Sequence, residues 1–367
     1  MDGLPLPGAQ RSSSGHRVRP RRSRRLVSVL ALLVLALVPT TSLDVESAGV
    51  DGKPAHHLRR GFRNLDEGYR YGMGVRMRRF VLGSFAAHPP RGAAPAVLGN
   101  DGGALRANGT HPTVTWVGHS TFLVQLDGLN ILTDPHWGNR ASPVEFAGPR
   151  RLVPPGLAFE DLPTIHAVLI SHDHYDHLDA DTVGRLAREH RPRFFVPLGL
   201  RAWLAERGIT DVVELDWWDR VEFRGLTVVC TPAQHSSGRT LTDQYLRLWS
   251  SWAVLGQTKR LFFAGDTGYD RRFKTIGDRL GPFDLAMMPI GGYSSFRGGH
   301  PNHVNPEEAV QLFEDLQGRL LVPMHWGTFT MNREPYREPS DRLMQEAFRR
   351  GIEEQVATLS PGQTVPW

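Results

Sequence analysis

The chain has 367 residues, of which 40% are hydrophobic, enough for one large or two ordinary domains with a full core. Its formal charge of +5 arises at the N-terminus, where residues 1–25 hold seven Arg and one Asp, so that 36 basic and 37 acidic residues remain elsewhere. This near-neutral body gives no support for a nucleic-acid partner, and the single cysteine, Cys230, excludes an internal disulfide and a thiolate metal cage.

The first 43 residues indicate a targeting or anchoring segment. Five residues from Arg21 to Arg25 precede an apolar run at 26–38, as the charged and hydrophobic regions of an export signal do. A helix of this run would extend about 20 Å, short of the roughly 30 Å hydrocarbon core, so we expect no full span. We predict a membrane-associated or exported, extracytoplasmic protein. An uncleaved anchor on the cytoplasmic membrane face, or a start codon placed too far upstream, is the alternative.

Residues 44–110 are predicted to be a connecting segment rich in Gly, Pro and Arg. Between residues 56 and 85, Arg is mixed with Phe, Tyr and Met. Such a mixture suits an anionic lipid surface, where each basic group contributes about 1 kcal/mol. The alternative is a strap that packs its aromatic side chains on the main domain and keeps its Arg in water.

Residues 111–367 are predicted to form the main domain, an α/β fold. Short strands alternate with helices, Asp127-Gly128 gives a hairpin signal, and Asn305-Pro306 marks a helix start. Two mixed β-sheets with helices packed outside them account for this order. The expected strands are 113–117, 121–126 and 129–133, and the expected helices are 181–189, 200–206 and 306–316.

The most informative stretch is residues 172–177, His-Asp-His-Tyr-Asp-His, which directly follows an apolar run. A strand that ends in such a cluster presents nitrogen and oxygen ligands from a rigid edge. His172 and His174 lie two apart and face the same way in extended backbone. Asp176 and His177 are adjacent and do not easily converge with them on one small ion. The spacing therefore predicts two metals.

Three further apolar runs, ending near residues 232, 264 and 324, each lead into a His or an Asp. We expect Asp266 to bridge the ions, because a carboxylate has two equivalent oxygens that bind two cations about 3.5–4 Å apart. The seven predicted ligands are His172, His174 and His235 for one ion, Asp176, His177 and His325 for the other, and Asp266 between them.

Several blocks besides the metal motif carry a family resemblance, among them Glu-Leu-Asp-Trp-Trp at 214–218 and His-Val-Asn-Pro-Glu-Glu-Ala at 303–309. Between residues 110 and 340 the chain resembles the metallo-β-lactamase superfamily, and more closely its N-acylphosphatidylethanolamine-hydrolysing phospholipase D branch. The metal motif marks only the superfamily, whereas the two blocks above are much narrower. The resemblance implies an αββα sandwich with two Zn²⁺ ions per chain at the edge of the sheets, although imidazole and carboxylate also accept iron or manganese.

The resemblance further implies a phosphodiesterase of phospholipase D type, in which a metal-bridging hydroxide attacks phosphorus in an N-acylphosphatidylethanolamine-like lipid. His303 is the candidate acid for the leaving alkoxide, and we expect Asp173 or Asp179 to orient a ligand imidazole. The predicted catalytic residues are Asp176, Asp266 and His303, and the predicted substrate contacts are Asn302, Tyr293 and Arg297.

Other functions stay open at this point. The same site in a metal-dependent lactonase or another hydrolase of this fold would act on a non-lipid substrate. A third class, a membrane-tethered zinc scaffold, is disfavoured by seven ligands, since structural zinc is saturated by four. Expected partners are a phospholipid or small phosphodiester and a membrane surface, with a homodimer left open and no nucleic acid. We interpret His119 as structural, Cys230 as a buried strand residue, and Trp217, Trp218, Trp249, Trp252, Met287 and Met288 as core.

Overall fold

The computed structural model describes residues 52–66, 92, 94–293, 301–331 and 334–367. The chain divides into two units, Met1–Ser47 and Ala48–Trp367, and all described residues lie in the second. The predicted N-terminal segment, residues 1–43, therefore lies outside the described residues. Among the helices that are described, none has the length and apolar composition needed to cross a bilayer.

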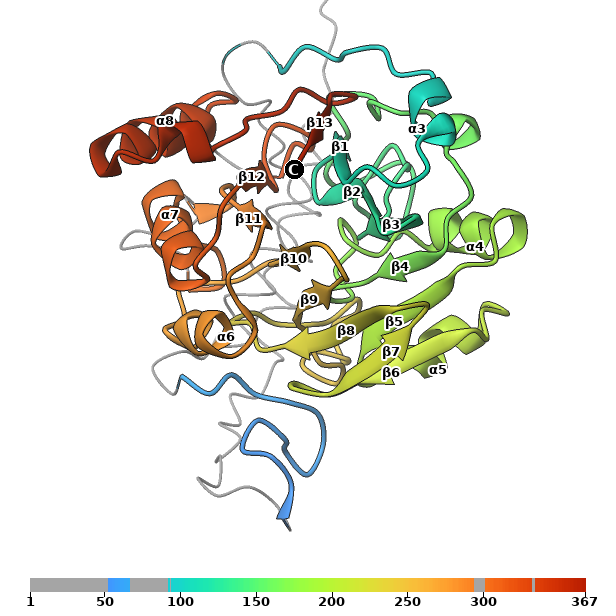
Figure 1. The fold of residues 1–367 in the computed structure, drawn as a ribbon. Coiled ribbons are helices and arrows are strands. Elements are labelled where there is room, and N and C mark those ends of the chain that lie inside the picture. The colour runs from blue at the N-terminus through green and yellow to red at the C-terminus, as the bar shows by residue number, and fades with distance from the viewer. Residues whose placement is uncertain (1–51, 67–91, 93, 294–300, 332–333) are drawn as a thin grey trace, which may run out of the picture. The chain divides into compact units, whose positions relative to one another are not determined.

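Two mixed β-sheets form the centre of this unit (Figure 1). The first sheet has seven strands in the order β13-β1-β2-β3-β4-β5-β6, antiparallel from β13 to β3 and parallel from β3 to β6. Its strands are β1 Thr113–Gly118, β2 Thr121–Leu126, β3 Leu129–Thr133, β4 Ala167–Leu169, β5 Arg193–Pro197, β6 Val212–Leu215 and β13 Thr364–Pro366.

The second sheet has six strands in the order β12-β11-β10-β9-β8-β7. Its pairs are parallel from β12 to β10 and antiparallel from β10 to β7. Its strands are β7 Arg220–Phe223, β8 Leu226–Thr231, β9 Ser251–Leu255, β10 Arg260–Phe263, β11 Leu285–Pro289 and β12 Leu321–Met324.

Helices cover the outer faces of both sheets (Figure 1). Helices α4 and α5 pack on the first sheet, and α6, α7 and α8 lie on the side of the second. The predicted αββα sandwich is confirmed. The helices are α3 Gly103–Ala107, α4 Ala180–Glu189, α5 Leu200–Ala205, α6 Arg272–Leu280, α7 Pro306–Asp315 and α8 Glu338–Arg350, with 3-10 turns η2 Phe159–Asp161 and η4 Glu353–Gln355.

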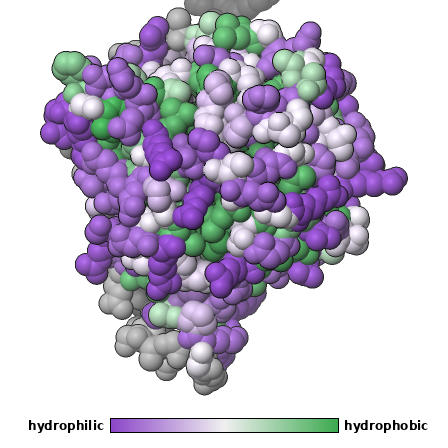
Figure 2. Space-filling view, in the orientation of Figure 1, coloured by the Kyte–Doolittle hydropathy of each residue, from purple (hydrophilic) through white to green (hydrophobic). Residues whose placement is uncertain are grey.

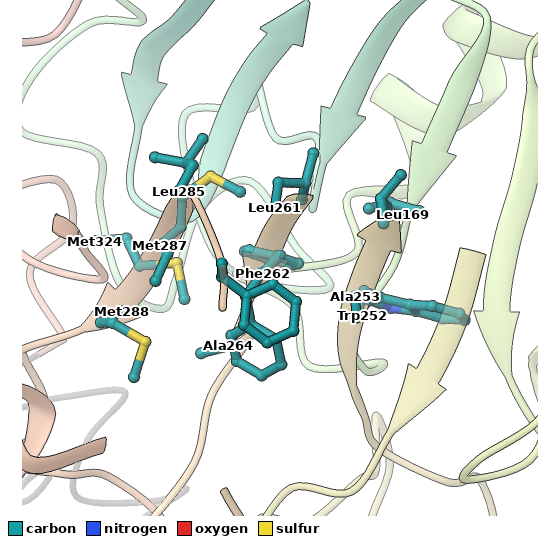
Figure 3. Close-up of a cluster of buried hydrophobic side chains, with 14 of the residues drawn as sticks. Leu169, Trp252, Ala253, Leu261, Phe262, Ala264, Leu285, Met287, Met288 and Met324 are labelled. Carbon is teal, nitrogen blue, oxygen red and sulfur yellow. The ribbon is translucent and has the colours of Figure 1, made fainter. Parts of the chain in front are cut away.

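Alternate side chains of the central strands enter two separate cores. In β2, Phe122 and Val124 join the core between the sheets, whereas Leu123 joins the core under α4 and α5. Because both faces are covered, all six residues of β2 are buried, as expected for a central strand. Figure 3 shows part of the core between the sheets, where Leu169 of β4 lies near Trp252 of β9. The face in Figure 2 is mainly hydrophilic, with small apolar patches.

The predicted core residues are confirmed by their burial. Trp217, Trp249, Trp252, Met287 and Met288 are buried in the core between the sheets, and Trp218 is partly buried against it. Cys230 is a buried residue of β8, as predicted.

Helix α7 begins where the sequence indicates. The Asn305 side chain accepts a hydrogen bond from the Glu308 backbone N–H at 2.8 Å, and the Glu308 carboxylate accepts one from the Asn305 N–H at 3.0 Å. This reciprocal capping box satisfies two backbone donors that a helix start leaves without a partner. The helix ends at Asp315, one residue earlier than expected.

Two described pieces of the predicted connecting segment pack against the sheets. Phe62 is buried in the core between the sheets, and Leu105 of α3 is buried in the other core. The remaining aromatic residues predicted for this segment, at positions 69–85, lie outside the described residues.

Candidate metal centre

All seven predicted metal ligands meet where β4, β8, β10 and β12 end. These four strands lead into the loops that carry residues 172–177, His235, Asp266 and His325. The structure therefore brings together the residues of both predicted sets, although they lie up to 153 positions apart in the sequence.

The first set consists of three imidazoles whose ring nitrogens face one another. His172 Nε2 lies 2.8 Å from His174 Nδ1, and His235 Nε2 lies 3.2 Å from the same atom. One hydrogen bond can join two such nitrogens, but a neutral imidazole offers only one N–H and one lone pair, so all three cannot be satisfied together. A cation placed among the three nitrogens would accept a lone pair from each.

The ring tautomers support this arrangement. His235 Nδ1 lies 2.9 Å from the backbone carbonyl oxygen of Asn302, which only accepts, so Nδ1 carries the proton and donates. The lone pair of His235 is therefore on Nε2, the atom that faces His174. Such a second contact fixes both the tautomer and the ring orientation of a metal ligand.

Asp266 lies between the two sets. Its Oδ2 atom has five imidazole nitrogens within 4.0 Å, more than one carboxylate oxygen can serve as a hydrogen-bond acceptor. This crowding is typical of a cage of ligands around cations. The distances from Asp266 Oδ2 are 3.1 Å to His177 Nε2, 3.1 Å to His325 Nε2, 3.7 Å to His235 Nε2, 3.7 Å to His303 Nδ1 and 4.0 Å to His172 Nε2.

Asp176 is the centre of the second set. Its Oδ2 atom lies 3.1 Å from His177 Nε2 and 3.3 Å from His325 Nε2. His119 Nε2 approaches the same oxygen at 2.9 Å, so this histidine, interpreted from the sequence as structural, directly contacts a predicted ligand. His119 is fully buried, and together with Asp176, His177 and His325 it forms a group of four side chains that could hold a metal ion.

The electrostatics of the two sets differ. Burial lowers the pKa of His235 to about 3 and the pKa of His172 well below its ordinary value, so both stay neutral. Burial alone would also lower the pKa of His325, but Asp266 and Asp176 outweigh it and raise this pKa to about 9. Burial would likewise lower the pKa of His177, but Asp266 and Asp176 raise it well above its ordinary value, so that in the absence of metal protons on His325 and His177 balance the two buried carboxylates.

Three residues at this edge adopt left-handed backbone conformations that side chains other than glycine rarely take. The φ angles are 54° at His119, 32° at Asp134 and 61° at His325. Such conformations cost about 1–3 kcal/mol each and persist where surrounding contacts impose them. Here the His325 N–H donates to the His119 carbonyl at 3.2 Å, and the His119 N–H donates to Thr328 Oγ1 at 2.8 Å.

Asp134 and Ser171 support ligands of both sets. Asp134 Oδ2 lies 2.7 Å from His177 Nδ1 and accepts from Ser171 Oγ at 2.5 Å, and Ser171 Oγ lies 2.9 Å from His172 Nδ1. The expectation that Asp173 or Asp179 orients a ligand imidazole is wrong. Neither carboxylate has a ligand imidazole among these partners: Asp173 accepts from the Gly238 N–H and from Arg247, and Asp179 accepts from Thr182 Oγ1 in the first turn of α4 and from the Gly138 N–H.

The position of Asp134, directly after the predicted strand 129–133, is the signal that could have identified it. A carboxylate at that place follows the same strand-end pattern as the metal ligands. Ser171 also follows an apolar run, at 167–170, but a Ser at a strand end is too common to indicate a site by itself.

The predicted substrate contacts lie in different surroundings. Asn302 is buried, with its side chain donating to Ser236 Oγ at 3.2 Å. Tyr293 is also buried, and its hydroxyl donates to Glu338 of α8 at 2.9 Å. His303 is nearer to solvent: its side chain is 14% exposed, against 2% for Asp266. Arg297 lies outside the described residues.

Fold and site together define a metal-dependent hydrolase. Residues 129–326, more than half of the chain, match the family described as Beta-lactamase superfamily domain, and the chain belongs to this superfamily. The family predicted from the motifs is therefore confirmed.

Proteins with similar sequences indicate a narrower group within the superfamily. The chain is 43% identical over 312 residues to an uncharacterized protein of Mycobacterium tuberculosis, covering 83% of this chain and 82% of that one. It is 46% identical over 243 residues to N-acyl-phosphatidylethanolamine-hydrolyzing phospholipase D 1 of Caenorhabditis elegans, covering 63% and 68%. The mitochondrial enzyme of that name from Saccharomyces cerevisiae is 32% identical over 257 residues, and the chain spans 55% of its length.

Solved structures share the fold. Igni18, a metallo hydrolase from the archaeon Ignicoccus hospitalis, superimposes with a TM-score of 0.54 at 25% identity, covering 70% of this chain and 99% of that one. The diiron β-hydroxylase CmlA from Streptomyces venezuelae reaches 0.54 at 20% identity, covering 71% and 55%, which shows the fold alone.

Proposed function

We propose that this metal-dependent hydrolase is a two-metal phosphodiesterase of phospholipase D type, with zinc as its metal and N-acylphosphatidylethanolamine-like lipids as its substrates. The observation that carries the proposal is the crowding around Asp266, whose Oδ2 contacts imidazoles of both ligand sets. The relatives from Caenorhabditis elegans and Saccharomyces cerevisiae, named for hydrolysis of this lipid class, support the substrate.

The residues fit a pair of ions. His172, His174 and His235 would hold one, Asp176, His177 and His325 the other, and Asp266 would contact both. Asp266 Oδ1 is buried and makes no hydrogen bond among the described residues, which leaves this oxygen available to a cation. When bound, two such metals polarise the phosphoryl group and provide a nucleophile from water at neutral pH.

His303 is the proposed acid for the leaving group. Its Nδ1 lies 3.7 Å from Asp266 Oδ2, and its ring centroid lies 5.0 Å from that of His325 and 5.2 Å from that of His235. Because His303 is the more exposed member of this cluster, its ring is placed to give a proton to the alkoxide of a substrate that enters from solvent. Asn302 would act by orienting His235 through its backbone carbonyl.

The alternative is a different bond at the same site, as in a lactonase. The fold does not discriminate between phosphodiester and lactone hydrolysis, since proteins of this fold act on different bonds and include an isothiocyanate hydrolase. The metal also needs direct identification, because a neighbour with this fold is a diiron enzyme.

A substrate screen tests the proposal. The full-length, metal-loaded protein is incubated separately with an N-acylated phosphatidylethanolamine, a lactone and bis-p-nitrophenyl phosphate. We expect N-acylethanolamine and phosphatidate from the lipid, with two metal ions per chain by elemental analysis. Opening of the lactone without cleavage of either phosphodiester would contradict the proposed chemistry, and one ion per chain would contradict the metal pair.

We also propose that the protein works at a membrane surface, to which residues 1–43 attach or export it. A phospholipid substrate places the reaction there. A homodimer stays a prediction that light scattering of the purified protein can check.

A further inference from the structure

Residues 52–66 lie well before the superfamily match at 129–326, yet they reach a predicted metal ligand. Asn64 Nδ2 donates to the backbone carbonyl of His235 at 2.7 Å, and the His235 N–H donates to Asn64 Oδ1 at 3.1 Å. One side chain thus satisfies both backbone groups of His235, as a neighbouring strand would. His235 needs this, because β8 ends at Thr231.

The same segment is fixed to the body of the molecule at two further points. Phe62 is buried in the core between the sheets, and its N–H donates to the Tyr245 carbonyl at 2.8 Å. Gly61, at φ 82°, approaches that carbonyl so closely that an added Cβ would lie 2.2 Å from its oxygen. Only glycine suits this contact.

The second point is a clasp formed by His56, His57 and Asp216. His56 Nε2 lies 2.7 Å from Asp216 Oδ1, and His57 Nε2 lies 2.7 Å from Asp216 Oδ2. The His56 ring also stacks on Trp217, with a centroid distance of 4.2 Å. Each imidazole N–H has its own carboxylate oxygen, so this clasp is satisfied by hydrogen bonds and needs no cation.

We propose that residues 52–66 are a strap that positions a metal ligand. Asn64 holds the backbone of His235 so that Nε2 faces His174, and the clasp holds the strap. His235 is then fixed twice, by Asn64 at its backbone and by the Asn302 carbonyl at Nδ1. Asn64 is a positioning residue, and its role rests on the proposed function only in taking His172, His174 and His235 as ligands of one ion.

The first test compares Asn64→Ala with Asn100→Ala in the full-length chain. Asn100 is a matched control, because it is also partly buried and also bonds backbone groups, donating to the Gly362 carbonyl at 2.8 Å and accepting from the Gly102 N–H at 3.0 Å. Each metal-free variant is titrated with Zn²⁺ by calorimetry and with Co²⁺ by visible absorption.

We expect Asn64→Ala to lose about tenfold in affinity for one of the two metal equivalents, as loss of groups that orient ligands usually causes. The other equivalent and all values for Asn100→Ala should match the parent protein. At saturating metal, KM should stay unchanged. A raised KM with unchanged metal affinity would mean that the strap contacts substrate instead, and would overturn the inference.

Two further variants keep the test decisive. Asn64→Asp retains the oxygen that accepts from the His235 N–H but loses the donor to its carbonyl, so the same selective loss is expected if Asn64→Ala fails to fold. The affinity losses of His57→Ala and Asn64→Ala should not add in the double variant, because both act through one strap. Fully additive affinity losses in the double variant would overturn the inference that residues 52–66 position His235. Equal metal affinity in Asn64→Ala and Asn100→Ala would overturn it as well. A parent protein that binds no metal would instead refute the proposed function.

Discussion

Asp134 shows how one buried residue can support both halves of the metal centre. It accepts from the Ser171 N–H at 2.7 Å and from Ser171 Oγ at 2.5 Å, and it contacts His177 Nδ1 at 2.7 Å. In Asp134→Asn an amide N–H₂ group replaces one carboxylate oxygen and faces the donors from Ser171 or His177, with which it cannot form a hydrogen bond. We therefore expect metal affinity to fall roughly 10–100-fold, measured by competition with a chromophoric chelator.

Asp179→Asn is the control for this change. Asp179 also accepts two hydrogen bonds, from Thr182 Oγ1 at 2.5 Å and the Gly138 N–H at 3.2 Å, but these partners are not metal ligands. Equal losses of metal affinity in Asp134→Asn and Asp179→Asn would contradict the role assigned to Asp134.

Metal loading should release protons at pH 7. Because Asp266 and Asp176 raise the pKa of metal-free His325 to about 9, against the effect of burial, this ring holds a proton below that pH. A metal that takes His325 Nε2 must displace the proton, so affinity at this site should rise with pH up to at least about pH 9, because the pKa of His177 is also raised by Asp266 and Asp176. The pKa of His235 is about 3, so His235 causes no such competition near neutrality.

Calorimetric titrations with Zn²⁺ in buffers of different ionisation enthalpy measure this release. We expect at least one proton per chain from the second metal equivalent at pH 7. An observed enthalpy that does not depend on the buffer would show that the second set is already deprotonated.

At the residue scale, the sequence identifies the residues that meet at the candidate site better than the residues that support them. His172, His235, Asp266 and His325 were identifiable because each follows an apolar strand, and strands of packed sheets bring their ends to one edge. Asn64 could not be found this way, since its contact with His235 spans 171 positions and depends on the folded strap.

At the scale of elements, the capping box makes α7 the helix whose start is best determined. In Asn305→Ala the acceptor for the Glu308 N–H is lost, so we expect the free energy of unfolding to fall by about 1 kcal/mol. Urea denaturation monitored by circular dichroism measures this change. Asn305→Ser keeps a capping oxygen and should be nearly neutral, and an equal loss in both variants would contradict the cap.

Strands β2 and β3 match the expected ranges residue for residue, because the Asp127-Gly128 turn fixes their register. Helices α6 and α8 were not predicted from the sequence, because few of their residues are apolar. In α8 the buried apolar side chains include only Leu343 and Ala347 besides Pro339. Its contacts with α7 include the ion pair of Arg342 with Glu307 at 2.6 Å, which depends on a neighbouring helix that the sequence does not reveal.

For the whole molecule, the division between Met1–Ser47 and Ala48–Trp367 separates the proposed attachment to membranes from the metal centre. The strap and all seven predicted ligands belong to the second unit. A chain that begins at residue 48 should therefore keep the thermal stability and the metal content of the full-length protein.

The same truncation should abolish binding to vesicles that contain anionic phospholipid. It removes the apolar run at 26–38 together with seven Arg, each worth about 1 kcal/mol near such a surface. Co-sedimentation of the two proteins with vesicles measures the difference. High salt should weaken the binding of the full-length protein to the vesicles, because salt screens the Arg charges. If the truncated chain binds equally well, the membrane contact lies in residues 48–367, and the Arg and aromatic residues between positions 56 and 85 become its expected location.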